Sequence, residues 1–363
     1  MHVEPFSIAV DESIVSDLRA RIRSTRWPAP SPEAPWAQGT DLGYLRDLLA
    51  YWADGFDWRE QERRLNAVDH FRADVDGVRI HYVHVRRSGL PLILTHGWPS
   101  TFVEHLQLVP YLGGFDLVIP SLPGYGFSER PARNTTRDTA RVWHRLMQGL
   151  GYDRYGAQGG DFGASVTTHM AFEEPDRLVG IHLHQIDDRP PAGGPPPSDA
   201  EREYAAAVEA WDAVERGYSS IQSTKPQTVA YALNDSPAGL AAWIVEKWRS
   251  WSDDLDAVDR DVLLTNLTLF WATQTIGTSM RDYYDMRWHR REIGPGERVR
   301  VPTAVALFAN ELVSEGTPPR EWAERMYDIR RWTPMPRGGH FAPAEQPELL
   351  AQDIATFFDS VRP

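Results

Sequence analysis

Short apolar runs along the middle of the chain alternate with amphipathic stretches, a pattern that predicts β-strands separated by helices. Five such runs are expected to be strands: Pro91–Thr95, Phe115–Pro120, Tyr155–Gln158, Gly180–His184 and Val301–Phe308. Before them, residues 70–87 alternate around Asp76-Gly77, which is a strong signal for a β-hairpin. Helices are expected over Val142–Leu150 and, at the end of the chain, over Glu345–Val361. This order predicts an α/β fold with a mostly parallel sheet and helices on both faces.

The N-terminal part of the chain predicts three short helices. Asp11 is an expected N-cap for a helix ending near Arg23, and the proline-rich run that follows should stop it. Two further helices are expected over Leu42–Trp52 and Trp58–Val68. Because three short helices bury little apolar surface on their own, we expect them to wrap the main domain.

The pattern changes again between about residues 187 and 298, where long helical stretches are rich in tryptophan. Helices are expected over Glu201–Arg216, Gly239–Trp251 and Asp261–Tyr284. An insertion of this size in such a sheet is expected to form a cap, or lid, over the site. The predicted organisation is a helical lead (1–75), a first core part (76–186), the cap (187–298) and a second core part (299–363).

Composition narrows the possible partners. The chain has 363 residues, 42% of them hydrophobic, with a formal net charge of −13 and no cysteine. The negative charge argues against nucleic acid and anionic membranes as partners, and the absence of cysteine excludes disulfides and thiolate chemistry. Neither a signal peptide nor an apolar run of membrane-spanning length is evident, so a cytoplasmic protein is expected. The composition is compatible with a homodimer without requiring one.

The candidate chemistry centres on residues 155–164, Tyr-Gly-Ala-Gln-Gly-Gly-Asp-Phe-Gly-Ala. Small residues at Gly159, Gly163 and Ala164 surround Asp161, which is the spacing of the nucleophile elbow of α/β-hydrolases. Most elbows carry serine, whereas a carboxylate suits displacement at a saturated carbon and would give a covalent ester. The alternative interpretation is a glycine-rich turn with an incidental acid.

Two further segments complete a catalytic triad in the chain order nucleophile, acid, histidine. His340 lies in Arg-Gly-Gly-His-Phe-Ala-Pro, between the last predicted strand and the last helix. Glu311, directly after the strand Val301–Phe308, is the best candidate for the acid that orients it. Other acids stay open: Asp187 or Asp188 could substitute, while Glu315 and Asp328 lie further out, on sequence expected to form loop and helix.

The segment His96-Gly97-Trp98-Pro99 follows the strand that ends at Thr95. The backbone N–H of Trp98, together with that of Phe162 after the nucleophile, would form an oxyanion hole for the hydrolysis of an ester intermediate.

Longer motifs make the resemblance specific. They are His-Gly-Trp-Pro-Ser (96–100), Gly-Gly-Asp-Phe-Gly (159–163), Arg-Gly-Gly-His-Phe-Ala (337–342) and, in the cap, Gln-Ser-Thr-Lys-Pro-Gln-Thr-Val (222–229) and Ala-Leu-Asn-Asp-Ser-Pro-Ala-Gly-Leu (232–240). With them the chain resembles a bacterial member of the microsomal-type epoxide hydrolase family over nearly its whole length. It departs from membrane-bound members in showing no anchor helix, and its loop Val313–Pro319 is longer than usual.

The resemblance implies two cap tyrosines that hydrogen-bond the epoxide oxygen and protonate the alkoxide. By motif these fall on Tyr218 and Tyr283, with Tyr284 as the alternative to the second. It also implies hydrolysis of an epoxide by water to a vicinal diol without metal or cofactor. The aromatic cap suggests a bulky, aromatic substrate, such as a styrene-oxide-like compound or a secondary-metabolite epoxide.

Two alternative functions stay open. A haloalkane dehalogenase shares Asp-based displacement on this fold but does not need two cap phenols, and a tryptophan often follows its nucleophile where this chain has Phe162. A non-catalytic binding homologue would sense a small apolar ligand and would keep its response after Asp161→Asn.

Overall fold

The computed structural model describes residues 1–186, 194–308 and 317–362. Within these residues nine strands form one sheet in the order β1-β2-β3-β5-β4-β6-β7-β8-β9. The strands are β1 (His2–Phe6), β2 (His70–Val75), β3 (Val78–Val85), β4 (Leu90–Thr95), β5 (Phe115–Pro120), β6 (Tyr155–Gly159), β7 (Leu178–Leu183), β8 (Pro302–Leu307) and β9 (Asp328–Pro334). Pairing is antiparallel from β1 to β5 and parallel from β5 through β4 to β9. The predicted mostly parallel sheet of an α/β fold is thus confirmed.

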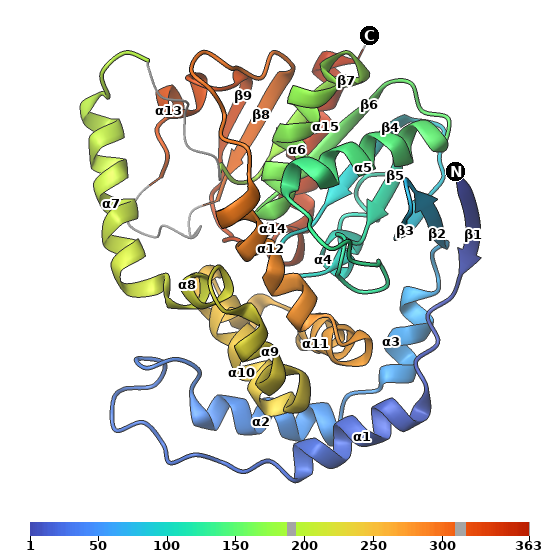
Figure 1. Ribbon diagram of the computed structural model, residues 1–363, viewed down its shortest axis with the longest axis vertical. Helices are drawn as coiled ribbons and strands as arrows, with labels where there is room; N and C mark the ends of the chain where they lie inside the picture. Colours follow the sequence, from blue (N-terminus) through green and yellow to red (C-terminus); the bar gives the residue numbers. More distant parts are fainter. Residues whose placement is uncertain (187–193, 309–316, 363) are drawn as a thin grey trace.

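Helices cover both faces of this sheet. α5 (Thr136–Gly149) and α6 (Phe162–Glu173) lie on one face and α15 (Pro347–Val361) lies on the other (Figure 1). Every residue of β5, β6 and β7 is buried, as expected for parallel strands sandwiched between helical layers. Three short helices lie in the connections of the core: α4 (Phe102–Leu106), α13 (Arg320–Glu324) and α14 (Ala342–Glu345).

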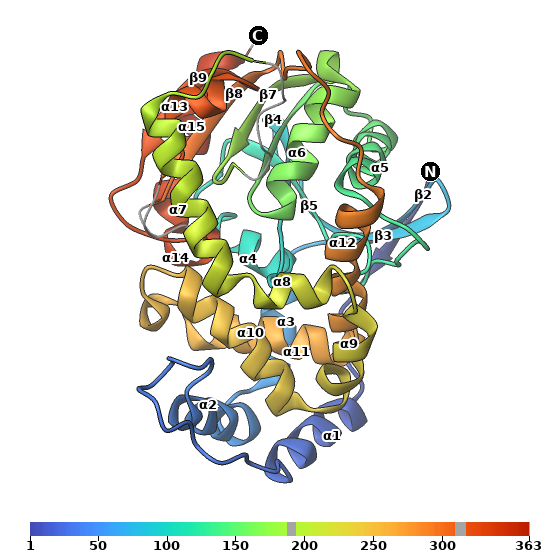
Figure 2. The same ribbon diagram turned by 60° about the vertical axis from the view of Figure 1, so that its left-hand side comes forward.

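The helices between β7 and β8 form the cap, which lies beyond the C-terminal ends of the parallel strands (Figures 1 and 2). They are α7 (Asp199–Glu215), α8 (Gly217–Gln222), α9 (Pro226–Asp235), α10 (Pro237–Trp251), α11 (Arg260–Thr273) and α12 (Ile276–His289). The single helix expected over Asp261–Tyr284 is broken into two. Gln274 adopts a left-handed conformation (φ 55°, ψ 34°) that ends α11, so the chain turns before α12 begins.

The N-terminal helices pack differently from the prediction. α1 (Glu12–Arg23), α2 (Leu42–Asp54) and α3 (Trp58–Leu65) contact α10 and α11 of the cap. The cap lies between the sheet and the pair α1 and α2, whereas α3 lies beside α11 and leads into β2 (Figures 1 and 2). The buried indole N–H of Trp52 donates to Thr268 Oγ1 (2.9 Å), and the Thr40 hydroxyl donates to the Ala242 carbonyl (2.6 Å). The lead also supplies β1, which the sequence pattern did not predict, and the proposed boundary after residue 75 falls inside the β2–β3 hairpin. The lead therefore braces the cap and extends the edge of the sheet.

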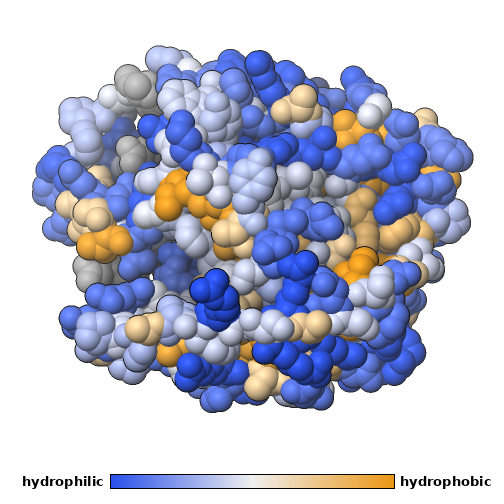
Figure 3. Space-filling model, turned by 60° about the horizontal axis from the view of Figure 1, so that its bottom comes forward, coloured by the Kyte–Doolittle hydropathy of each residue, from blue (hydrophilic) through white to orange (hydrophobic). Residues whose placement is uncertain are grey.

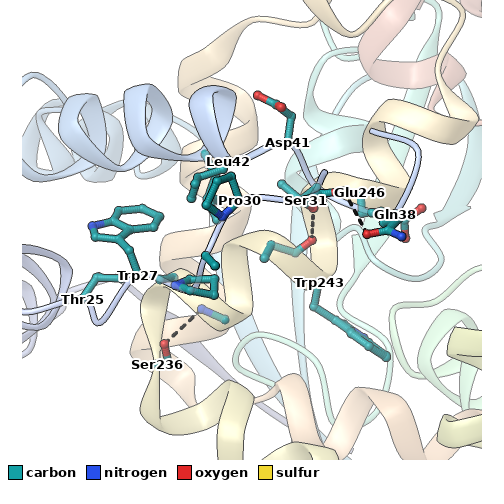
Figure 4. Close-up of a pocket in the computed structure, with 18 of the residues that line it drawn as sticks. Thr25, Trp27, Pro30, Ser31, Gln38, Asp41, Leu42, Ser236, Trp243 and Glu246 are labelled. Carbon is teal, nitrogen blue, oxygen red and sulfur yellow. Dashed lines mark hydrogen bonds between the residues drawn. The ribbon is translucent and has the colours of Figure 1, made fainter. Parts of the chain in front are cut away.

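A cleft of about 1170 Å³ lies where the loop between α1 and α2 crosses the cap. Trp27 and Trp243 lie on opposite sides of it, and Ser31 and Gln38 are hydrogen-bonded to one another on its loop side (Figure 4). The surface at this end of the molecule is mostly hydrophilic, with apolar side chains in small groups (Figure 3). Among the described residues, no helix is both long enough and apolar enough to cross a membrane.

Candidate active site

Asp161 occupies a sharp turn between β6 and α6. Its backbone has φ 52° and ψ −132°, a strained conformation for a residue with a side chain, and it caps the first turn of α6. Neighbouring positions must be glycine for the chain to pass: a Cβ on Gly163 would lie 2.0 Å from the Thr95 carbonyl oxygen, and one on Gly97 would lie 2.3 Å from the Cβ of Asp161. The side-chain oxygen of Gln185, after β7, accepts the Asp161 backbone N–H (2.7 Å). The turn thus has the geometry of a nucleophile elbow.

The two oxygens of the Asp161 carboxylate have different surroundings. Oδ1 accepts the backbone N–H groups of Trp98 (2.8 Å) and Phe162 (2.6 Å), the pair expected to form the oxyanion hole. Oδ2 lies 3.5 Å from Nε2 of His340. One oxygen is therefore held where negative charge is stabilised, and the other faces the histidine.

His340 lies in the loop between β9 and α14, as the chain order predicts. Its backbone N–H donates to the Trp251 carbonyl (2.8 Å), and its ring packs edge-on against the Trp251 ring at a centroid distance of 5.0 Å. The side chain is buried, and the imidazole lies between Trp251 of the cap and Asp161.

The candidate acids are placed only in part. Glu311, Glu315, Asp187 and Asp188 lie outside the described residues. Asp328 is the first residue of β9, whereas the sequence suggested loop or helix there. Because β9 runs parallel to β8, Asp328 lies where the parallel strands begin, whereas the elbow lies where they end. Asp328 is therefore too far from the elbow to be the triad acid.

Two buried carboxyl groups that the sequence analysis missed lie near His340. Burial raises the pKa of Glu104, on α4, to about 7, although a hydrogen bond from Ser100 and the nearby His340 favour its ionised form. Burial likewise raises the pKa of Glu345 to about 7, although its carboxylate accepts the N–H groups of Asp253 (2.8 Å) and Phe341 (3.0 Å). Both groups therefore change charge near neutral pH, close to the imidazole. No local signal distinguishes these glutamates from surface acids.

Tyr218 on α8 and Tyr283 on α12 face one another across the site, with ring centroids 5.8 Å apart. The Trp98 ring stacks on Tyr218 (5.4 Å, 6°), and the Phe162 ring meets Tyr283 edge-on (4.9 Å, 85°). Burial, aided by the neighbouring Tyr218 and Asp161, raises the pKa of Tyr283 well above its usual value, so this phenol keeps its proton at neutral pH.

Tyr284, the alternative to Tyr283, points elsewhere. It is 38% exposed, and its ring lies beside Trp288 (6.3 Å) and His289 (6.2 Å) on the outer side of the cap. The structure therefore brings Tyr283, and not Tyr284, next to the elbow.

A further cap residue, Trp251, closes the site. Its ring contacts Tyr218 (5.2 Å) as well as His340, and the Lys247 ammonium lies over both the Tyr218 and Trp251 rings (4.7 and 5.6 Å). Lys247 is buried and paired with Glu246 (2.6 Å). The Asp161 carboxylate is thus surrounded by aromatic rings from both core and cap.

Comparisons with known proteins agree with this geometry. Residues 3–105 match the family model for the epoxide hydrolase N terminus, and residues 91–304 match that for the α/β-hydrolase fold. The chain is 34% identical to epoxide hydrolase 1 of Oryctolagus cuniculus, over 98% of this chain and 88% of the relative. The crystal structure of juvenile hormone epoxide hydrolase from Bombyx mori superposes with a TM-score of 0.88 at 31% identity, covering 99% of this chain and 95% of that one.

The structure of an epoxide hydrolase from Aspergillus niger is similar to the same degree. It has a TM-score of 0.87 at 29% identity and covers 99% of this chain and 97% of its own. Such agreement extends over the lead, the core and the cap together. The chain therefore belongs to the epoxide hydrolase family of α/β-hydrolase enzymes, which confirms the resemblance carried by its sequence motifs.

Proposed function

We propose that this enzyme converts a bulky epoxide with an aromatic group to a vicinal diol through a covalent ester of Asp161. The observation that carries the proposal is that the two oxygens of the Asp161 carboxylate have different partners. Two backbone N–H groups donate to Oδ1, while Oδ2 faces His340. A carboxylate held in this way attacks with one oxygen and keeps the other in a site that stabilises negative charge.

In the first step, Oδ2 of Asp161 attacks an epoxide carbon and the bond between that carbon and the ring oxygen breaks. The phenols of Tyr218 and Tyr283 donate hydrogen bonds to the leaving oxygen, and one of them supplies the proton that converts the alkoxide to a hydroxyl group. The raised pKa of Tyr283 supports this role, because the phenol is protonated when the substrate arrives. The product of this step is a hydroxyalkyl ester.

In the second step, His340 removes a proton from water, and the water oxygen attacks the ester carbonyl. The oxyanion develops on Oδ1, between the N–H groups of Trp98 and Phe162. When this oxyanion collapses, the bond between the carbonyl carbon and the alkyl oxygen breaks, and that oxygen takes the proton held by His340 to give the diol. The carboxyl group that remains contains one oxygen from water, and its proton returns to the tyrosine that lost one in the first step, which restores the Asp161 carboxylate. In this proposal Glu311 orients the imidazole, and no metal or cofactor takes part.

The experiment that tests the mechanism is a single turnover of styrene oxide in heavy-oxygen water, with the enzyme in excess. The first diol should be unlabelled, because its new oxygen comes from Asp161, and the peptide that contains Asp161 should gain the label. A labelled diol with an unlabelled peptide would mean direct attack by water. If no diol forms, a panel of haloalkanes tests the dehalogenase alternative.

The two neighbouring tyrosines of α12 provide a matched pair of variants. Tyr283→Phe should slow ester formation on the order of 10²-fold, because the leaving oxygen loses one of its two donors. Tyr284→Phe should leave the rate unchanged, because its ring lies beside Trp288 and His289. Stopped-flow measurement of ester formation decides the matter, and equal effects of the two substitutions would contradict the assignment.

The aromatic walls support the proposed substrate class. Trp98, Phe162, Tyr218, Trp251 and Tyr283 all lie within ring contact of another member of this group. Equal kcat/KM for small aliphatic and aryl epoxides would contradict this preference.

Two broader predictions from the sequence remain predictions: a cytoplasmic location and a homodimer. For the latter, five of the exposed large apolar side chains lie on the cap, which is compatible with association of two copies: Val214, Ile221, Tyr231, Tyr284 and Trp288.

A further inference from the structure

Arg130 joins the core to the helix that carries Tyr283. Its Nη1 donates to Asp282 Oδ1 (2.5 Å) and its Nη2 donates to Asp285 Oδ2 (2.8 Å). The side chains are nearly inaccessible: 4% exposed for Arg130 and 7% for each aspartate. A single guanidinium therefore holds both acidic residues that flank Tyr283 along α12.

The loop that carries Arg130, residues 121–135, makes further polar contacts with α12. The backbone N–H of Asn134 donates to Asp285 Oδ2 (2.9 Å), and the Thr278 hydroxyl donates to the Gly124 carbonyl (2.5 Å). Thr278, Asp282 and Asp285 are spaced four and three residues apart, so they share one face of the helix. Tyr283 is about 100° further round the helix and meets Phe162 instead.

The energetics favour a geometric role for this cluster. Burying three charged groups is expensive, and an apolar contact of the same volume stabilises a fold as well or better. What an arginine adds is a planar fork that fixes two carboxylates at once, which a lysine ammonium cannot reproduce. The charges thus hold α12 at one rotation and height relative to the core.

We propose that Arg130 is a positioning residue, which places the Tyr283 hydroxyl at the epoxide oxygen through its ion pairs with Asp282 and Asp285. The inference rests on the function proposed above, in which Tyr283 acts on the leaving oxygen. It goes further in assigning a role to three residues that do not touch the substrate.

Ester formation and ester hydrolysis should respond differently to a change at Arg130. Ester formation needs Tyr283 in place, so a small rotation of α12 slows it. Ester hydrolysis depends on His340 and on the N–H groups of Trp98 and Phe162. Among the residues that the structure describes, the hydrogen-bond partners of Arg130 lie on α12 and on its own loop. Weakening the ion pairs of Arg130 with Asp282 and Asp285 should therefore slow ester formation and leave ester hydrolysis unchanged.

The test is rapid-quench kinetics of the full-length enzyme and of Arg130→Lys with styrene oxide. Intact-mass measurement of the ester follows its formation and its decay separately. Ester formation should slow on the order of 10-fold, less than for Tyr283→Phe because the phenol is displaced and not removed, while ester decay stays within about twofold of the wild-type rate.

Arg331→Lys is the matched control. Two nitrogens of Arg331 also bind a buried aspartate, at Oδ1 of Asp353 (2.7 and 2.5 Å), but this pair joins β9 to α15 in the core and not to a cap helix. Its substitution should lower thermal stability without changing the ratio of the two rate constants. A purely structural role for Arg130 would give the same pattern as this control.

A second variant keeps the test decisive if Arg130→Lys does not fold. Asp285→Asn preserves the shape of the side chain and an oxygen for the Asn134 N–H, and it removes the negative charge that pairs with Arg130. It should also slow ester formation selectively. Unchanged ester formation in a folded variant, or equal slowing of both steps, overturns the positioning role alone, whereas a wild-type enzyme that forms no ester overturns the proposed function as well.

Discussion

His340→Gln should convert the enzyme into a stable covalent ester after one encounter with an epoxide. Attack by Asp161 needs no base, but hydrolysis of the ester needs His340 to take a proton from water. Turnover should fall on the order of 10²- to 10⁴-fold, the usual contribution of a general base. Intact-mass analysis after addition of styrene oxide should show one equivalent of adduct, which peptide mapping should place on Asp161.

The exposed histidine of α12 offers a control for this experiment. His289→Gln removes an imidazole from the outer side of the cap, where the ring lies beside Tyr284, and should leave turnover unchanged. Repeated turnover by His340→Gln with no detectable adduct would mean that another group activates the water.

Asp161→Asn should remove turnover almost completely and should give no ester. The amide has nearly the same shape, keeps an oxygen for the N–H groups of Trp98 and Phe162, and is not a nucleophile at neutral pH. Loss of an enzymatic nucleophile typically costs 10⁴-fold or more, on the order of 10⁶ in the best-studied hydrolase triad. Steady-state diol formation and intact mass measure the two effects.

Asp153→Asn, at a fully exposed aspartate, is the control for a surface change of the same kind. Because asparagine has the same size and shape as aspartate, it meets the same backbone strain at φ 52° and ψ −132°, and the substitution at 161 should not disturb the turn. A variant that still forms diol, with its new oxygen taken from water, would indicate direct hydrolysis. A variant that keeps an unaltered response to a bound ligand, while the wild type shows no turnover, would favour the binding-protein alternative.

Short-range sequence patterns correctly predict several elements of the fold. Alternation around Asp76-Gly77 correctly predicts the β2–β3 hairpin, since both residues take the positive φ values that a tight hairpin turn demands. Asp11 caps α1 as expected, because a short acceptor before an amphipathic stretch satisfies the first free N–H groups. The elbow was recognisable for the same reason: a strained turn requires small neighbours, and those leave a pattern in the sequence.

Other features depend on contacts between distant segments, and no local pattern encodes them. Consecutive tyrosines at 283 and 284 are indistinguishable by composition, yet they lie about 100° apart on a helix, so packing of α12 against the core turns one inward and the other outward. The break at Gln274 that aims α12 at the core interrupts a stretch with helical character throughout.

The chain by itself thus determined most of the strands and helices of the core, the tight turn at Asp161 and the place of His340 before the last helices, since each depends on neighbours within a few residues. Only the tertiary structure decided that the lead braces the cap, that Glu104 lies near His340, and that Arg130 holds α12 across 152 and 155 residues of sequence. The physical reason is that charge pairing and burial act between surfaces brought together by folding, and a buried acid or arginine carries no local mark of its partner.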